Sequence, residues 1–193
     1  MITTEIKGIP LRFETDTTSF SPTAIDRGTL AMLSVAEFNE DGKVLDLGCG
    51  YGVVGILAAK LIGAENVVLC DINKKAVELA AQNASLNDAA GVTVVKSDGF
   101  RELDAAGFSL ILSNPPYHTD FHIAKHFIEK GFNRLVVGGK FLMVTKRRDW
   151  YRNKIAAIFG GVKVHEIDGY FVFEAQRRGL SYANAKPRGG KVK

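Results

Sequence analysis

The stretch "KVLDLGCGYGVVGILAAKLIG", from Lys43 to Gly63, decides the fold. Its first half is a short apolar run that ends in glycines, which is typical of a buried strand followed by a tight turn. Its second half has apolar residues at helical spacing and stops at a glycine, as helices commonly do. A buried strand, a glycine turn and a helix in this order predict the beginning of an alternating α/β sheet.

The rest of the chain continues this alternation of strands and helices. Further strands are predicted in "NVVLCD", "VTVVKSD", "FSLILSN" and "GGKFLMVTK", and helices in "NKKAVELAAQNASLN", "FHIAKHFIEKGFNRLV" and "DWYRNKIAAIFGG". A last pair of strands turns at Asp168–Gly169, a typical hairpin dipeptide. We therefore predict an α/β fold with a doubly wound, mainly parallel seven-stranded sheet and an antiparallel C-terminal hairpin at one edge.

The two ends of the chain differ from this pattern. Residues 1–40 are expected to form an extension with a hairpin around Gly8 and a helix over "SPTAIDRGTLAMLSVAEF", with Ser21 as its N-cap and Pro22 at its first position. Residues 1–178 should form a single domain. Residues 179–193, "GLSYANAKPRGGKVK", are expected to be a basic, flexible tail.

Composition excludes several classes of protein. The 193 residues contain no apolar run near the roughly 20 residues that span a bilayer. The opening "MITTEIKGIP" lacks the basic and apolar regions of a signal peptide. The two cysteines, Cys49 and Cys70, each lie in an apolar strand or turn, which favours buried thiols and a reducing, cytoplasmic setting. We expect no membrane partner.

The net charge of +4 is unevenly distributed. From Lys146 to Lys193 there are twelve Lys or Arg against four Asp or Glu, a balance of +8, which leaves −4 for the rest of the chain. A basic end on a slightly acidic body indicates either a polyanion partner or a solubilising tail.

The glycine turn "GCGYG" is a candidate ligand loop. Gly48, Gly50 and Gly52 allow the backbone to turn tightly and to approach a ligand closely. A dinucleotide fingerprint would need a third glycine where this chain has Val53. The spacing G-x-G-x-G is instead the one associated with S-adenosylmethionine sites.

Acidic residues lie at or near the ends of three successive predicted strands. Asp46 could face the ammonium group of such a cofactor, Asp71 could accept both ribose hydroxyls, and Asp98 could receive the adenine amino group. Ile72 and Phe100 could sandwich the adenine, although each could equally be a core residue. Single strand-end acids are often caps, but three along one rim favour a ligand that contains a nucleoside.

The fourth strand ends in "SNPPY", Ser113 to Tyr117. Pro115 and Pro116 lock two φ angles and remove two N–H donors. The side-chain oxygen of Asn114 and the carbonyl of Pro115 can then accept both hydrogens of a planar amino group, while Tyr117 stacks on it. Positioning of this kind aims the nitrogen lone pair at a methyl sulfonium without a strong base. The alternative is an ordinary proline turn.

These motifs resemble a known family. "LDLGCGYGVVG", "CDIN" and "SNPPY" are similar to class I S-adenosylmethionine-dependent methyltransferases that act on exocyclic or amide nitrogen. "FSPTAIDRGTLAML" resembles the Phe-Ser-x(4)-Asp-x-Gly-Thr segment of the "methyltransferase small" domain, found in guanine-amino methyltransferases of the ribosomal RNA small-subunit methyltransferase C type. The resemblance covers Phe20 to Ala175. It implies a Rossmann-like methyltransferase fold, S-adenosyl-L-methionine as cofactor, and Asn114, Pro115, Pro116 and Tyr117 as catalytic residues, of which Asn114 also contacts the cofactor.

The implied reaction is methyl transfer to an exocyclic amino group of RNA, most simply guanine in ribosomal RNA or a ribosomal subunit. Tyr117 departs from the Phe or Ile usual in this subfamily, and Asn-Pro-Pro-Tyr is common in adenine-amino and protein-glutamine methyltransferases, which are the alternative. A third hypothesis is a non-catalytic cofactor-binding module. The intact Asn-Pro-Pro-Tyr motif argues against it, because a module that only binds a cofactor does not need a clamp for an amino group. We expect a single-domain version without the duplicated N-terminal half of some relatives, which would leave RNA binding to this domain or a partner.

Two further clusters have more than one interpretation. His118, His122 and His126 are spaced four apart, a stripe that could bind a metal, face RNA or be ordinary surface. Because the proposed transfer needs no metal, we expect none.

The stretch "TKRRDWYRNK" mixes basic and aromatic residues. Its cations could meet phosphates while Trp150 and Tyr151 stack on unpaired bases. The alternative is a helix start with a solvated face and Trp150 packed on the core. The residues concerned are Lys146, Arg147, Arg148, Trp150, Tyr151 and Arg152.

Overall fold

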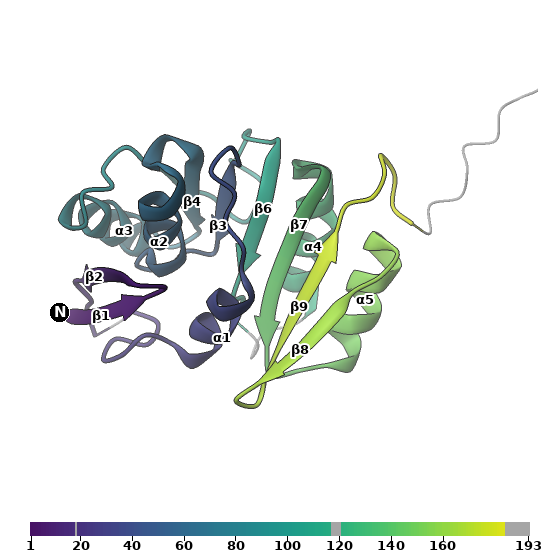
Figure 1. Ribbon diagram of the computed structural model, residues 1–193, viewed down its shortest axis with the longest axis horizontal. Helices are drawn as coiled ribbons and strands as arrows, with labels where there is room; N and C mark the ends of the chain where they lie inside the picture. Colours follow the sequence, from purple (N-terminus) through teal and green to yellow (C-terminus); the bar gives the residue numbers. More distant parts are fainter. Residues whose placement is uncertain (18, 117–120, 184–193) are drawn as a thin grey trace, which may run out of the picture.

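The computed structural model describes residues 1–17, 19–116 and 121–183. The chain folds into a seven-stranded sheet covered by helices on both faces, with a small two-stranded sheet beside it (Figure 1). The strand order is β5-β4-β3-β6-β7-β9-β8. The first five strands in this order are parallel, and β9 pairs antiparallel with both β7 and β8. The predicted doubly wound sheet with an antiparallel C-terminal hairpin is confirmed.

The elements follow the predicted order. The strands of the large sheet are β3 (Val44–Leu47), β4 (Val67–Asp71), β5 (Thr93–Lys96), β6 (Phe108–Ser113), β7 (Leu135–Thr145), β8 (Lys163–Ile167) and β9 (Tyr170–Gln176). The helices are α1 (Arg27–Val35), α2 (Val53–Ile62), the short 3-10 helix η1 (Ala64–Asn66), α3 (Lys74–Leu86), α4 (Phe121–Arg134) and α5 (Asp149–Phe159). Within the described ranges, no helix has the length and apolar character needed to cross a membrane.

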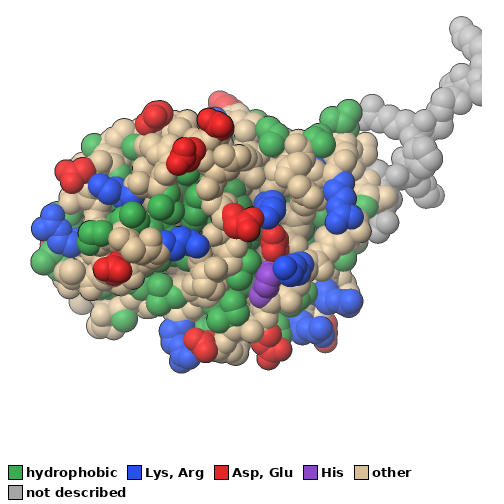
Figure 2. Space-filling model, in the orientation of Figure 1, with side chains coloured by type: hydrophobic (Ala, Val, Ile, Leu, Met, Phe, Trp, Pro, Cys, Tyr) green, Lys and Arg blue, Asp and Glu red, His purple; other side chains and the backbone are tan. Residues whose placement is uncertain are grey.

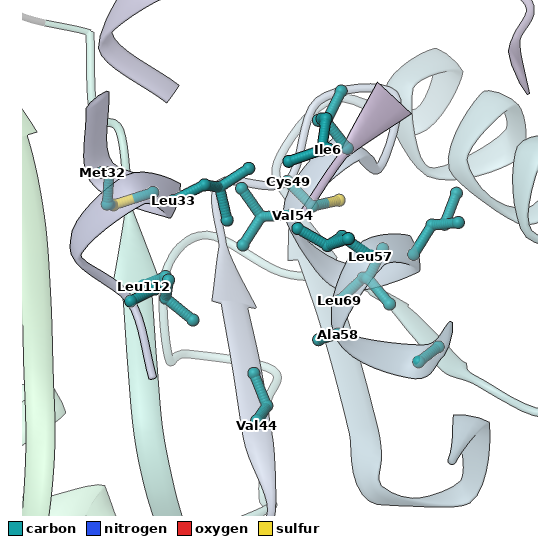
Figure 3. Packing of buried hydrophobic residues seen from close by; sticks show 14 of the residues in the cluster. Ile6, Met32, Leu33, Val44, Cys49, Val54, Leu57, Ala58, Leu69 and Leu112 are labelled. Carbon is teal, nitrogen blue, oxygen red and sulfur yellow. The ribbon is translucent and has the colours of Figure 1, made fainter. Parts of the chain in front are cut away.

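Alternate residues of the central strands supply a core on each face of the sheet. Val44 packs on the side of α1 and α2, whereas its neighbour Leu45 packs on the side of α4 and α5. Figure 3 shows the first of these cores, where side chains from α1 and α2 meet those of the central strands. Helix α2 lies close to β4 because Gly55 has no side chain. A Cβ added at Gly55 would lie only 2.4 Å from the Leu69 side chain.

The N-terminal extension begins with the expected hairpin. Strands β1 (Ile2–Ile6) and β2 (Ile9–Phe13) pair antiparallel around a turn in which Lys7 and Gly8 both have positive φ. Two buried side-chain amides, Asn83 in α3 and Asn87 at its C-cap, hold the hairpin by hydrogen bonds to the backbone of residues 12 and 14. The extension is therefore part of the packed domain.

The predicted start of the first long helix was wrong. Helix α1 begins at Arg27, and its N-cap is Asp26, whose carboxylate accepts a hydrogen bond from the Thr29 N–H at 2.8 Å. Ser21 instead has φ of 53° and donates from its hydroxyl to the Ala24 carbonyl, which closes a local turn. Ser-Pro and Asp-x-x-Thr are both start signals, and the second one caps the helix here.

The C-terminal segment also departs from expectation at its beginning. The Tyr182 hydroxyl donates to the Glu129 carbonyl, and its ring packs edge-on against Phe132 at 5.0 Å. The N–H of Ala183 donates to the Ile158 carbonyl. Residues up to 183 are thus anchored on α4 and α5, so a flexible tail cannot start at Gly179. Residues 184–193 lie outside the described part of the chain.

Candidate active site

A cavity of about 390 Å³ lies at the carboxyl ends of β3, β4, β5 and β6. Its volume is in the range of sites that hold cofactors, and this end of a parallel sheet is where open α/β folds bind ligands. In Figure 1 this is the end at which the arrows of β6 and β7 point, beside α1. The predicted site residues that line the cavity are Asp46, Gly48, Gly50, Asp71, Ile72, Asp98, Asn114, Pro115 and Pro116. Tyr117 lies outside the described residues.

The glycine turn forms one wall of the cavity. The N–H groups of Gly48 and Cys49 both donate to the Cys70 carbonyl at 2.9 Å, which holds the turn against the end of β4. Gly50 has φ of 53°, and a Cβ added there would meet nothing within 4 Å, so the backbone is exposed to a ligand at this point. Gly52 does not line the cavity. It has φ of 99° at the N-cap of α2, and its missing side chain allows Ile56 and Ala80 to pack closely.

Asp71 is held rigidly at the end of β4. One carboxylate oxygen accepts from the Gly50 N–H at 2.9 Å, and the other accepts from the Asn73 N–H at 2.8 Å. Each oxygen keeps a further lone pair for a ligand hydroxyl. The next residue, Ile72, lines the cavity although 61% of its surface is exposed. An oriented carboxylate beside an exposed apolar side chain fits a ribose with an attached base.

Asp46 lies at the base of the cavity and is only 3% exposed. Its carboxylate accepts from the Gly55 N–H at 2.8 Å. Burial raises the pKa of Asp46 to about 7, and the nearby Asp71 carboxylate adds to the rise. A buried carboxyl group with this pKa would be stabilised in its charged form by a cationic ligand group.

Asp98 and its surroundings match the prediction only in part. Asp98 lines the cavity, but its carboxylate also pairs with Arg101 at 2.7 Å. Phe100 is 4% exposed and belongs to the core on the α4 side, so it does not form one side of an adenine sandwich. Its backbone N–H points to Nε2 of His126 at 3.4 Å, and burial lowers the pKa of that histidine.

The side-chain amide of Asn114 has a defined orientation. Its amide nitrogen donates to Asp26 Oδ2 at 2.8 Å and to Thr29 Oγ1 at 3.0 Å. A carboxylate only accepts hydrogen bonds, so the nitrogen of the Asn114 amide must face it and the carbonyl oxygen must face the other way. The Asp-x-Gly-Thr motif at residues 26–29 marks this segment in the sequence, but no local sequence pattern indicates that it contacts Asn114.

Both cysteines line the cavity, and both are buried, free thiols. Burial raises the pKa of Cys49 well above its usual range and that of Cys70 to about 12. Neutral thiols are poor nucleophiles, so neither residue is suited to form a covalent intermediate.

Aromatic and basic residues gather next to the cavity, at the start of α4 and of α5. Phe121 stacks on Trp150 with ring centroids 4.3 Å apart, and the guanidinium of Arg147 lies 5.3 Å from the Phe121 ring. Trp150 is half-buried and packs against the core. Tyr151 is 3% exposed, so it is a core residue rather than a stacking surface for bases.

Two of the three histidines of the predicted stripe lie in the described part of the chain. His122 is exposed, whereas His126 is half-buried against Phe100. His118 lies outside the described residues. Among the residues that the structure describes, no group of three or more His, Cys, Asp or Glu is placed to hold a metal ion.

The basic residues of the C-terminal quarter divide between the two ends of the sheet. Arg147 and Arg148 follow β7 at the cavity end. Arg177 follows β9, which runs antiparallel to β7, and therefore lies at the opposite end. Its guanidinium donates to the carbonyl of Leu135 and lies over the Phe132 ring, so its role there is structural.

Comparison with known proteins places these features in context. The profile of the family described as Methyltransferase small domain matches residues 10–174. An uncharacterised protein, YbxB, from Bacillus subtilis is 30% identical over 86% of this chain and 85% of its own length. Ribosomal RNA small subunit methyltransferase C from Haemophilus ducreyi is 35% identical over 76% of this chain, but over only 46% of its own length.

Solved structures give the same picture. A T. thermophilus 16S rRNA N2 G1207 methyltransferase, solved in complex with AdoMet and guanosine, superposes with a TM-score of 0.82 and 26% identity. The match covers 92% of this chain and 50% of that protein. A methyltransferase from Pyrococcus furiosus shares the fold, with a TM-score of 0.71 and 18% identity. The chain spans about half the length of the methyltransferase C relatives that it matches.

Proposed function

Because the chain belongs to the methyltransferase small domain family, we propose that it transfers a methyl group from S-adenosylmethionine to the exocyclic amino group of guanine in ribosomal RNA. The observation that carries this proposal is the orientation of Asn114. Its amide nitrogen is engaged by Asp26 and Thr29, so its carbonyl oxygen is left to accept from a substrate amino group beside the cavity.

The residues around the cavity fit the cofactor. Asp71 would hold the ribose hydroxyls, Ile72 would cover one face of the adenine, and Asp46 would face the ammonium group. Asp98 would reach the adenine amino group while it keeps its pairing with Arg101. When bound, S-adenosylmethionine supplies an electrophilic methyl group on a sulfonium.

The role of the corner after β6 is to position the substrate. Asn114 and the carbonyl of Pro115 would accept the two hydrogens of a planar amino group, which holds that group in line for transfer. Pro115 and Pro116 keep the corner rigid and free of competing N–H donors. Tyr117 would stack on the base. The substrate nitrogen therefore needs orientation rather than a strong base.

RNA as the substrate is supported by the surface beside this corner. The exposed Phe121, with Arg147 over its ring, lies at the sheet end where Lys146 and Arg148 are also exposed. Figure 2 shows Lys and Arg side chains on the lower right of this face, near the sheet end where β7 stops. Cations beside an exposed aromatic ring suit a single-stranded nucleic acid, because the cations can contact its phosphates and the ring can contact its bases. The T. thermophilus neighbour, a 16S rRNA methyltransferase, supports a ribosomal substrate.

The partner would then be ribosomal RNA, either free or within a ribosomal subunit. We also propose that the protein works in the cytoplasm. The two free, buried thiols of Cys49 and Cys70 support a reducing compartment.

Methyl transfer from radiolabelled S-adenosylmethionine to fractionated RNA and protein tests the proposal. The label should enter small-subunit ribosomal RNA, and digestion should place it on guanine N2. Asn114→Ala should slow single-turnover transfer on the order of a hundredfold or more while cofactor affinity is retained. Label in protein, or in adenine, would overturn the guanine assignment in favour of the corresponding alternative. An unchanged rate in Asn114→Ala would show that Asn114 does not hold the substrate amino group.

A further inference from the structure

We infer that Asp26 and Thr29 are positioning residues that set the polarity of the amino-group clamp, an inference that rests on the proposed function. They lie at the beginning of α1 and reach Asn114 from a segment 88 and 85 residues earlier in the chain. Their effect on the substrate is indirect, because they determine which end of the Asn114 carboxamide is presented to it.

The contact geometry accounts for both hydrogens of the Asn114 amide. One hydrogen is directed to Asp26 Oδ2 at 2.8 Å and the other to Thr29 Oγ1 at 3.0 Å. Asp26 is itself fixed, because the same oxygen accepts the Thr29 backbone N–H at 2.8 Å as the N-cap of α1. Thr29 is 8% exposed and is therefore held by packing.

The start of α1 is also anchored to the sheet. Gly28 lies against the Tyr170 ring so closely that an added Cβ would come within 2.9 Å of two ring carbons. Tyr170 begins β9 and is buried. The two acceptors for Asn114 are therefore carried by a rigid helix end, as a precisely oriented group requires.

This arrangement makes one orientation of Asn114 much more stable than the other. If the amide were flipped, its carbonyl oxygen would face the Asp26 carboxylate, which cannot donate, and the bond from the amide nitrogen to Asp26 would be lost. The Thr29 hydroxyl could donate to the flipped oxygen, so Asp26 sets the preference and Thr29 supports the observed orientation as an acceptor. In the observed orientation, the described part of the corner offers two acceptors, Asn114 Oδ1 and the Pro115 carbonyl. An amino group can donate its two hydrogens to these acceptors and so binds at the corner. A ring carbonyl has no hydrogen to donate and does not bind there. Asp26 and Thr29 thus contribute to the choice of an amino group as substrate.

Two pairs of variants separate this role from the capping role of Asp26. Asp26→Asn keeps an acceptor of the same length for both Asn114 and the Thr29 N–H, whereas Asp26→Ser keeps a good N-cap but is too short to reach Asn114. Thr29→Ser keeps the hydroxyl acceptor, and Thr29→Val removes it at nearly constant volume. We expect single-turnover transfer at saturating cofactor to fall at least tenfold in Asp26→Ser and severalfold in Thr29→Val. Asp26→Asn and Thr29→Ser should recover most of that loss.

A double-mutant cycle tests whether Asp26 acts through Asn114. In the Asn114→Ala background, Asp26→Ser should cause no further loss of rate, because the group that it orients is absent. A loss of the same size in both backgrounds would show a structural role only and would overturn the inference. So would a wild-type rate in Asp26→Ser.

A readout independent of activity comes from nuclear magnetic resonance. The Asn114 side-chain amide is identified as the ¹⁵N–¹H₂ pair that disappears in Asn114→Ala. In the wild-type protein its two hydrogens should exchange slowly with water, and in Asp26→Ser exchange should accelerate at least tenfold. Fast exchange in the wild type would overturn the inference. If the wild type methylated no RNA but these signals behaved as described, the proposed substrate would fail while the orientation of Asn114 would stand.

Discussion

The backbone N–H of Gly50 donates a hydrogen bond to a carboxylate oxygen of Asp71 across 2.9 Å. This bond ties the glycine turn after β3 to the acid that ends β4. The other oxygen of Asp71 accepts from the Asn73 N–H, just before α3. One carboxylate therefore fixes both the wall of the cavity and its own orientation toward a ligand.

Replacement of Asp71 should weaken cofactor binding. Asp71→Ala loses up to two hydrogen bonds from the ribose, each worth at most about 1.5–3 kcal/mol for a charged acceptor, and it also frees the Gly50 N–H. Asp71→Asn should lose less, because it can still accept from Gly50. Calorimetric titration with S-adenosylhomocysteine measures both effects. The exposed Asp41, which precedes β3 at the other end of the sheet, provides the control variant Asp41→Ala. Unchanged affinity in Asp71→Ala would remove this residue from the site.

The raised pKa of Asp46 predicts a pH-dependent stability. Its pKa is about 7 in the folded protein against the ordinary value of 3.8 for an exposed aspartate. Between these values the folded state holds a proton that the unfolded state has lost, so the free energy of unfolding decreases as pH rises from about 4 to about 7. Since one pKa unit corresponds to about 1.4 kcal/mol, the largest possible decrease in the free energy of unfolding is roughly 4 kcal/mol.

Asp46→Asn should remove this dependence, because an amide can still accept from the Gly55 N–H but does not ionise. Urea unfolding of both proteins without cofactor, at pH 5 and at pH 8, measures the difference. The wild type should lose more stability than the variant between the two pH values. Parallel changes in the two proteins would show that Asp46 titrates normally.

Gly28→Ala should disturb α1 and the clamp together. The added Cβ would lie 2.8 Å from a Tyr170 ring carbon and 3.0 Å from Asp26 Oδ2, so the helix start must shift. We expect a loss of about 1–3 kcal/mol in unfolding free energy, as for other overpacked sites, and slower single-turnover methylation. Gly161→Ala is the matched control, because a Cβ at Gly161 would meet nothing within 4 Å. Equal stability and rates in both variants would contradict the observed packing.

Charge reversal beside the cavity should weaken RNA binding. Arg147→Glu removes a cation from the Phe121 ring and from the reach of phosphates, so the dissociation constant for RNA should rise and its salt dependence should decrease. Arg178→Glu changes the same charge at the opposite end of the sheet and should have a smaller effect. Binding measured at several salt concentrations compares the two variants. Equal effects in both variants would point to nonspecific attraction rather than to this surface. Cofactor affinity should change in neither.

Much of the fold was predictable from local sequence patterns. The alternation of apolar strands and amphipathic helices indicated a parallel sheet, and the Asp168–Gly169 dipeptide indicated the final hairpin. The acids at Asp46 and Asp71 were expected on one rim because the carboxyl ends of parallel strands share an edge. These inferences succeeded because strand period, turn chemistry and strand direction are properties of short segments.

The sequence by itself thus determined the sheet, the glycine turn and the residues at the rim. Only the tertiary structure decided that α1 starts at Arg27 and that Asp26 meets Asn114, 88 residues away. It also placed Phe100 in the core and Arg177 at the far end of the sheet from Arg147. Such contacts depend on how helices pack across a twisted sheet, and a local pattern of residue types does not specify the distance between remote side chains.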